Sequence, residues 1–316
     1  MTTSLLTLAE ALRSSLATGQ LQPLHLTQPL DRRDRFLTLL TVYDLHTAPL
    51  DVIGDAAKYQ GHPAVAELKA RLEEEWLAEL ESEWGAAQQR FDSGDVVEAM
   101  KDIAITDRLP AAYRWLAETA DWEQVVDFLA LEGGPDGGFD DLVAACQIGL
   151  SGSAKLELGK NYWDELGQGD PGGVHTVLHD RFVAAAGIPR IPRTDLPVEA
   201  LERAAIGGLL ATNRWLQPEF LGALGLIELQ AGPRCRLVLK AFDRLKAPED
   251  AYPFYAEHAQ VDPIHGRDWL DKAIVPTVAD HPEWGPRILK GAWWRARVNL
   301  AFFARMHQEL VGELAA

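Results

Sequence analysis

Apolar side chains spaced three and four residues apart recur along most of this 316-residue chain, and this spacing most limits how it can fold. Between residues 63 and 91, Val65, Leu68, Leu72 and Trp76 follow the pattern, with acidic residues between them. We find no alternating apolar and polar runs bounded by Asn-Gly or Asp-Gly, the pattern typical of hairpin strands. The sequence therefore predicts an all-α protein.

Glycine- and proline-rich segments divide this pattern into separate helices. Residues 133–138 read Gly-Gly-Pro-Asp-Gly-Gly, residues 167–173 hold four glycines and a proline, and residues 188–197 hold three prolines. Such residues end or interrupt helices. The predicted helices span residues 63–91, 95–105, 111–119, 122–132, 139–150, 154–166, 171–186, 197–210, 218–231, 233–245, 251–261, 263–277 and 285–314.

The first 55 residues are less regular than the rest of the chain. They carry prolines at positions 23, 29 and 49 and show weaker helical periodicity. We therefore expect residues 1–55 to form an N-terminal extension that adds extra helices, packed on or loosely tied to one helical domain of residues 56–316.

Charge and composition exclude several classes of partner. The net charge is −17, from 47 acidic and 30 basic side chains, so the chain repels phosphate backbones and anionic membranes. No apolar stretch approaches 18 residues and the N-terminus resembles no signal peptide, so we expect a cytoplasmic protein. Cys146 and Cys235 belong to no CxxC pair and have apolar neighbours, which predicts core residues and no disulfide.

The most specific feature lies in residues 255–269, where His258, Asp262 and His265 stand at positions i, i+4 and i+7. At about 100° per residue, the three positions fall within about 60° of one another on a helix. One helical face would then present imidazole, carboxylate and imidazole over two turns. Imidazoles and carboxylates together suit iron, zinc or manganese, and helical bundles build such sites from facing side chains.

A structural explanation of the same residues stays open. Asp262-Pro263 is also typical of a helix start, with the aspartate as N-cap and the proline at the first helical position. A proline inside a helix would also remove the hydrogen bond to the Ala259 carbonyl and could kink the helix. Such a kink could still aim the ligands inward, so the two explanations do not exclude each other.

Three further acids lie at positions where the negative charge of a carboxylate is unfavourable unless another group offsets it. Glu228 follows an apolar run, residues 221–227, and a lone carboxylate there costs several kcal/mol unless it is protonated, paired or metal-bound. Glu165 lies in the last turn of a predicted helix, where its charge opposes the helix dipole, and His175 follows after the break. Alone, both also fit ordinary surface or core roles, and Glu132 equally fits a simple helix end.

Two of these motifs together resemble the heme-oxygenase-like diiron oxidases, a family of iron-containing redox enzymes. One is HxxxDxxH at residues 258–265, preceded by Glu228 in an Ala-Leu-Gly-Leu-Ile-Glu helix. The other is NYWDELGxG at residues 161–169, followed by His175. The resemblance covers roughly residues 60–316, and its joint spacing makes it fairly specific, whereas either motif alone would be weak.

The resemblance implies a fold, a cofactor and a reaction type. The fold would be a heme-oxygenase-like bundle of about seven core helices, without heme, and the cofactor would be two Fe(II) ions with dioxygen as co-substrate. The protein would be an iron-dependent oxidoreductase that oxidises a small organic substrate by N-oxygenation, C–C cleavage or desaturation. The positions that match the family's metal ligands are Glu132, Glu165, His175, Glu228, His258, Asp262 and His265.

Further residues and partners follow from this interpretation. Tyr255, three residues before His258, is expected on the same helix face and is a candidate for substrate binding. The candidates for orienting the histidines are Glu157, Asp164 and Asp268, and His179 stands at i+4 from His175. We expect a small-molecule substrate and neither a nucleic acid nor a membrane partner, and leave an external electron donor and a homodimer open.

Two other functions are compatible with the same scaffold. One is a metal-free, thiaminase-like enzyme, whose metal content would not respond to changes at His258 or Glu228. The other is a non-catalytic helical binding protein, which would leave the predicted burial of Glu228 unexplained.

Overall fold

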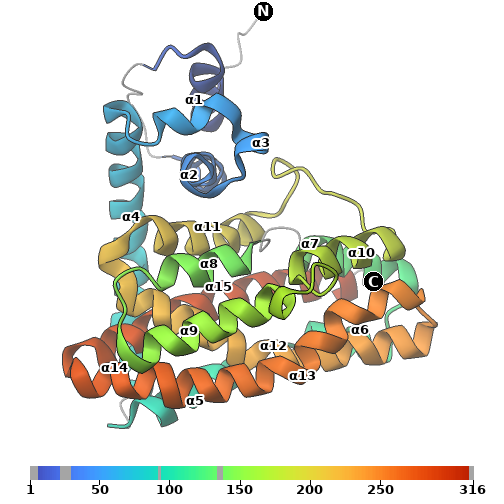
Figure 1. Cartoon of the computed structure of the whole chain (residues 1–316). Coiled ribbons are helices and arrows are strands. Elements are labelled where there is room, and N and C mark those ends of the chain that lie inside the picture. The colour runs from blue at the N-terminus through green and yellow to red at the C-terminus, as the bar shows by residue number, and fades with distance from the viewer. Residues whose placement is uncertain (1–5, 22–29, 92–93, 134–137, 313–316) are drawn as a thin grey trace, which may run out of the picture.

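The computed structural model describes residues 6–21, 30–91, 94–133 and 138–312, and in these ranges the chain forms helices and no strands (Figure 1). The predicted all-α class is confirmed. The α-helices are α1 (Leu8–Thr18), α2 (Arg32–Thr47), α3 (Leu50–Ile53), α4 (Pro63–Ala87), α5 (Val96–Thr106), α6 (Ala111–Glu118), α7 (Trp122–Gly133), α8 (Phe139–Cys146), α9 (Gly152–Glu165), α10 (His175–Ala186), α11 (Val198–Thr212), α12 (Gln217–Leu245), α13 (Tyr252–Asp268), α14 (Val275–Asp280) and α15 (Gly285–Gly312).

Helix α12 forms the centre of the bundle and packs against α13, α15 and α6. Glycines allow it to approach its neighbours closely. A Cβ at Gly222 would lie 1.9 Å from the carbonyl oxygen of Ile288 on α15, and one at Gly291 would lie 1.9 Å from that of Glu219. On the other side, Gly266 of α13 faces the backbone of Glu228. Small residues therefore fix how α12 is held between α13 and α15.

Prolines do not divide the two long helices that the sequence analysis had split. Pro233 lies inside α12 and Pro263 lies inside α13, so the predicted breaks after residues 231 and 261 are wrong. In α13 the carbonyl of Ala259, whose helical partner is lost to Pro263, accepts a hydrogen bond of 3.0 Å from Nη1 of Arg236. Close packing of α13 on Gly232 and this hydrogen bond from α12 compensate for the proline.

Two other boundaries also differ from the prediction. Helix α10 begins at His175, after the glycine-rich segment, whereas the sequence predicted a start at residue 171. After α13 the chain continues through a π-helical segment, Trp269–Ile274, into α14. Trp269 is fully buried there and donates a hydrogen bond to the Leu221 carbonyl of α12, at 3.0 Å.

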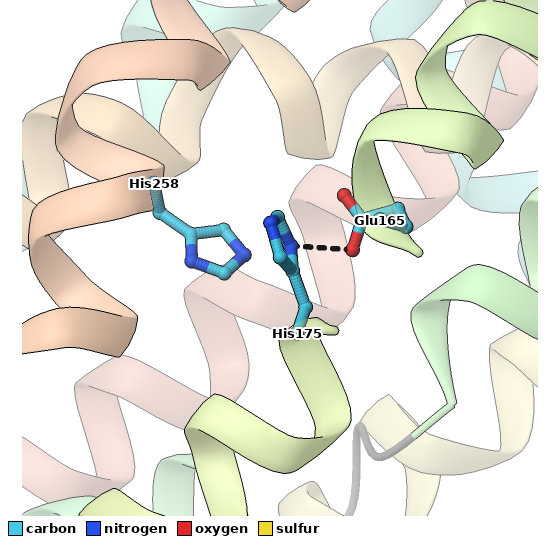
Figure 2. A group of neighbouring side chains, drawn as sticks. All are labelled: Glu165, His175 and His258. Atoms are coloured by element: carbon cyan, nitrogen blue, oxygen red, sulfur yellow. Dashed lines mark ion pairs between the residues drawn. The ribbon is translucent and has the colours of Figure 1, made fainter. Parts of the chain in front are cut away.

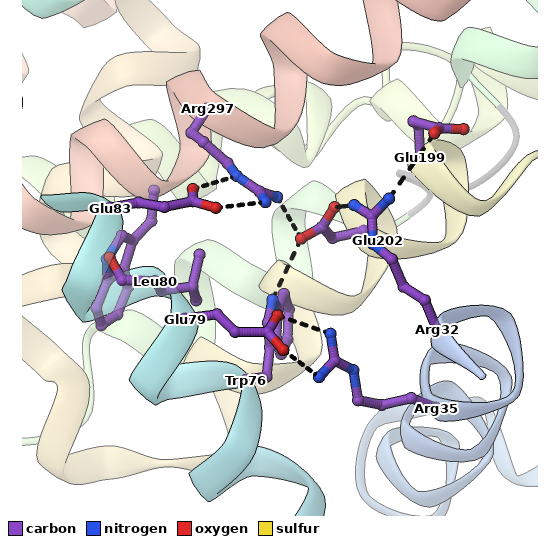
Figure 3. Close-up of polar contacts among 10 residues, drawn as sticks. Arg32, Arg35, Trp76, Glu79, Leu80, Glu83, Glu199, Glu202 and Arg297 are labelled. Atoms are coloured by element: carbon purple, nitrogen blue, oxygen red, sulfur yellow. Dashed lines mark hydrogen bonds and ion pairs between the residues drawn. The ribbon is translucent and has the colours of Figure 1, made fainter. Parts of the chain in front are cut away.

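The N-terminal helices lie at one end of the bundle, where α2 packs against α11 and α4 (Figure 1). Buried Glu202 of α11 accepts hydrogen bonds from Arg32 of α2, Arg297 of α15 and the Trp76 indole of α4 (Figure 3). Arg35 forms a bidentate salt bridge with Glu79, in which Nη1 and Nη2 donate to the two carboxylate oxygens at 2.7 and 2.8 Å. This network joins four helices around one carboxylate. The boundary expected at residue 55 stays a prediction.

Gly222→Ala is expected to lower the free energy of unfolding by about 2–3 kcal/mol, because the new methyl group would overlap the Ile288 backbone. Equilibrium urea denaturation measures the change. Gly85→Ala in α4 is the matched control: apart from its own helix backbone, no atom of the described residues lies within 4 Å of its Cβ position, so better helix propensity should add about 0.5–1 kcal/mol. Equal effects of the two substitutions would contradict the close packing of α12 on α15.

Candidate metal centre

Buried carboxylates and buried or half-buried imidazoles from four helices converge in the bundle. Glu165, His175 and His258 form one group, and Glu165, Glu228 and His265 form a second, with the ligand atoms of each group within 4.8 Å of one another. The carboxylate of Glu165, the last residue of α9, belongs to both groups. The helices involved are α9, α10, α12 and α13, so residues as far apart as 165 and 265 meet at one place.

The first group joins the end of α9 to the start of α10. Oε2 of Glu165 lies 2.7 Å from Nδ1 of His175, and the His175 and His258 rings lie 4.5 Å apart between centroids (Figure 2). Although burial opposes the charged form, Glu165 outweighs it and raises the pKa of His175. Nδ1 of His175 is nevertheless not in hydrogen-bonding geometry. Nδ1 and the carboxylate thus lie side by side without a hydrogen bond between them.

His258 is held in one tautomer by its own helix. Its Nδ1 lies 2.7 Å from the Phe254 carbonyl oxygen, which can only accept, so Nδ1 carries the proton. Nε2 therefore keeps its lone pair. Burial, followed by the nearby His175, lowers the pKa of His258 to about 4, so the ring is neutral at pH 7. A neutral imidazole with a fixed tautomer is the form that binds metals.

His265 is held through the other ring nitrogen, Nε2. Its Nε2 lies 3.0 Å from Oδ2 of Asp164, which leaves Nδ1 facing Oε2 of Glu228 at 3.6 Å. Burial opposes its protonation, but Glu228 and then Asp164 outweigh this and raise the pKa of His265 to about 9. The expected orienting role of Asp164 is thus matched by a direct contact. The other two candidates, Glu157 and Asp268, lie beside Lys160 and Lys272 instead.

Glu228 is buried, as its apolar sequence context predicted, and it has a neutral partner as well. Oε1 of Glu228 accepts a hydrogen bond of 2.7 Å from Nδ2 of Asn161, which is itself buried. The sequence analysis assigned no role to Asn161. The available signal was its position four residues before Glu165, which places both on one face of α9.

Asp262 is 2% exposed and stands near both groups. Burial, then the negative charges of Glu228 and Glu165, raise the pKa of Asp262 well above its usual value. Its Oδ2 atom has no hydrogen-bond partner among the described residues. A carboxylate in this position is destabilised unless a proton or a cation neutralises it.

The residues fit a bound metal. Nδ1 of His175, Nδ1 of His265 and Oδ2 of Asp262 are buried polar atoms without hydrogen bonds in the described part of the chain. Each lies beside carboxylates that favour a positive charge. Mixed oxygen and nitrogen donors of this kind suit iron, zinc or manganese.

The structure does not bring Glu132 into either group. Its Oε1 accepts a hydrogen bond of 3.0 Å from the Tyr113 hydroxyl and lies 3.4 Å from Nη2 of buried Arg203. Arg203 also donates to the Glu132 carbonyl at 2.7 Å. Glu132 thus closes helix α7 through an ion pair, the alternative that its sequence context had left open, and we leave it out of the ligand set.

Two other residues lie close to the centre. The His179 ring stands 5.1 Å from Phe254 and belongs to neither group, and burial lowers the pKa of His179. Tyr255 is buried among Phe182, Phe242 and Phe254. Its role in substrate binding stays a prediction. Cys146 and Cys235 are buried and free, as expected for core residues.

The fold and the site together define a helical protein with a buried carboxylate and histidine centre. The sequence matches the family of iron-containing redox enzymes over residues 127–300, more than half of the chain. The chain therefore belongs to this heme-oxygenase-like family, and the resemblance inferred from the motifs is confirmed. No curated protein matches the sequence. Among the helices of the described residues, none has the length and apolar character needed to span a membrane.

Asp164→Ala is expected to weaken Fe(II) binding about 10- to 100-fold, because the His265 ring would lose the acceptor that fixes its tautomer. Anaerobic competition against a chelating dye measures the affinity. Asp127→Ala, at an exposed acid of α7, should change it less than twofold. An unchanged affinity in Asp164→Ala would show that this contact does not orient a metal ligand.

Proposed function

We propose that this protein is a non-heme diiron oxidase or oxygenase that uses dioxygen to oxidise a small organic substrate. The reaction would be an N-oxygenation, an oxidative C–C cleavage or a desaturation. The observation that carries the proposal is that Glu165 is shared by two buried groups, each of which also contains histidine. Membership of the iron-containing redox enzyme family supports iron as the metal.

Six residues would hold the metals. Glu165, His175 and His258 are the donors of one position, Glu165, Glu228 and His265 are the donors of the other, and Asp262 stands beside both. Two ferrous ions, when bound, supply reducing electrons and open coordination positions for dioxygen.

The protein's own part is orientation. The Phe254 carbonyl keeps Nε2 of His258 unprotonated, and Asp164 keeps Nδ1 of His265 turned toward Glu228. Asn161 fixes one oxygen of Glu228 and leaves the other facing His265. Each of these three candidate ligands is thus oriented by a neighbouring residue. Little side-chain freedom therefore remains to be lost when a metal binds.

Exclusion of water is the second contribution. Glu165, Glu228, Asp262 and His265 are each at most 3% exposed. Such burial strengthens every electrostatic interaction in the centre and protects reactive species from side reactions with water. Where the reaction consumes more electrons than the substrate supplies, the proposal includes an external electron donor.

The proposal is tested by loading the purified protein with Fe(II) without oxygen. We expect about two irons per chain, and then an oxygen-dependent absorbance change upon mixing with oxygenated buffer. Fewer than one iron per chain under these conditions, with no spectral change, would refute it. Metal-free protein treated identically is the control for adventitious oxidation.

Glu165→Gln is expected to reduce the iron content more than His258→Ala does, because Glu165 belongs to both groups and His258 to one. The wild type should bind about two irons, His258→Ala about one, and Glu165→Gln less than one, as measured by plasma emission spectrometry after anaerobic loading. Glu132→Gln is the matched acid-to-amide control and should keep two. Loss of iron in Glu132→Gln, with retention in Glu165→Gln, would contradict the assignment.

A further inference from the structure

Helix α9 lies at the outside of the bundle, between the candidate metal centre and solvent (Figure 1). Its inner side carries buried Asn161 and Glu165, and its outer side carries Leu156, Lys160 and Trp163. Leu156 and Glu165 are nine residues apart, which at about 100° per residue places them on opposite sides of the helix. The thickness of a single helix, about 10–12 Å with its side chains, therefore separates this outer side from the carboxylate shared by the two groups.

Two large apolar side chains on the outer side of α9 face solvent. Leu156 is 75% exposed and Trp163 is 51% exposed. Because they are seven residues apart, they lie two turns from each other on the same side of the helix. Exposed apolar residues that gather on one surface mark binding sites, and tryptophan is enriched where proteins bind each other. The outer side of α9 therefore has the character of a docking surface.

The charged residues of α9 are sorted between its two sides. Its lysines, Lys155 and Lys160, are exposed. Its acids have side chains that are at most 15% exposed, and they are Glu157, Asp164 and Glu165. In a chain with 47 acidic and 30 basic side chains, this sorting gives α9 a cationic outer side.

Residues from the end of α13 and the π-helical segment extend this cationic surface. Oδ2 of Asp268 lies 3.2 Å from Nζ of Lys160 and 2.7 Å from Nζ of Lys272. Its Oδ1 lies 3.6 Å from Nε of Arg267, and Glu157 lies 3.9 Å from both lysines. The three cationic side chains are 48–64% exposed, whereas the two carboxylates are 5% and 8% exposed. Positive charge is therefore what this surface presents to a partner.

A short route connects the surface to a candidate metal ligand. Trp163 is followed in the chain by Asp164, and Oδ2 of Asp164 lies 3.0 Å from Nε2 of His265. One peptide unit and one side-chain contact thus separate the exposed tryptophan from His265. An electron that enters at Trp163 has a short path to the centre.

We propose that the face formed by Leu156, Lys160, Trp163, Arg267 and Lys272 is the docking site of a small acidic electron-carrier protein. Each encounter passes one electron to the centre and leaves the carrier oxidised by one electron. An N-oxygenation or a desaturation that releases the remaining oxygen of dioxygen as water consumes two electrons and two protons beyond those of the substrate. Two encounters supply these electrons, and solvent supplies the protons. This inference rests on the proposed function, since it identifies a partner of the same centre.

The size and charge of the docking face suit a transient complex. Electron-transfer complexes are small and bury less than about 1,200 Å², an area that one helix and its neighbouring segment can provide. The net charge of −17 is largely screened beyond about 8 Å at physiological salt, so the charges in contact decide which partner binds. The cations of the docking face therefore select an acidic carrier.

Isothermal titration with two acidic one-electron carriers, a plant-type ferredoxin and a flavodoxin, tests the proposal. Metal-free protein and protein loaded anaerobically with Fe(II) are both titrated, and the iron content of each sample is measured. At least one carrier should bind both forms with a Kd below about 100 μM. Its affinity should fall as salt is raised from about 50 to 500 mM, because the contact is electrostatic.

Leu156→Glu should weaken carrier binding at least about tenfold, because it adds a negative charge and removes an apolar contact while the exposed position tolerates it. Leu50→Glu, at a leucine of α3 that is equally exposed, is the matched control and should bind as the wild type does. In the iron-loaded, oxidised protein, Leu156→Glu should also slow oxidation of the reduced carrier at least about tenfold, with the iron content unchanged. The visible absorbance of the carrier measures that rate.

The double substitution Lys160→Gln and Lys272→Gln should likewise weaken binding at least about tenfold. The matched control is Lys58→Gln with Lys240→Gln, two exposed lysines that also pair with acids but lie on other helices. It should bind the carrier as the wild type does.

Equal binding by Leu156→Glu and Leu50→Glu, or no binding of either carrier, would overturn the inference. A wild type that still takes up two irons and reacts with oxygen would then keep the proposed function intact. Protein that takes up no iron but binds a carrier through this face would refute the diiron proposal while supporting the docking site.

Discussion

The burial of Glu165, Glu228 and Asp262 at one point is the constraint on which the site depends. Carboxylates this close cannot all stay ionised in a low-dielectric interior without positive charge beside them. In the structure, neighbouring carboxylates raise the pKa of His175 and of His265, and burial, followed by Glu228 and Glu165, raises the pKa of Asp262. A bound divalent cation resolves the same conflict, so the electrostatics and the family membership agree on a metal.

The bundle positions this charge through close helix contacts. Small residues let α13 lie against the Glu228 backbone and the Gly232 turn, which places Asp262 and His265 beside Glu228. Pro263 lies at the same contact, and Arg236 binds the carbonyl freed by that proline. Arg236 lines one cavity of about 320 Å³ together with Glu228 and Asp262.

Much of this could be predicted from the sequence, for identifiable reasons. The spacing of His258, Asp262 and His265 is a local property of one helix, and all three lie on α13, with His258 in one group, His265 in the other and Asp262 near both. The cost of an isolated carboxylate likewise made Glu228 a reliable candidate. These inferences needed no knowledge of tertiary structure.

What the sequence did not supply depends on contacts between distant segments. Pro233 and Pro263 signalled helix ends, and only the packing of α12 against α13 explains why both helices continue. Glu132 matched a family ligand, but Arg203, 71 residues later, binds it instead. Asn161 begins the NYWDELGxG motif, but its role follows from its contact with Glu228, 67 residues later.

The central claim is that Glu165 serves two metal positions at once. Anomalous diffraction at the iron absorption edge, on crystals of protein loaded with Fe(II) under anaerobic conditions, tests this most directly. The account predicts two iron peaks, both within coordinating distance of the Glu165 carboxylate, with His258 at one and His265 at the other. A single peak, or peaks remote from Glu165, would contradict it.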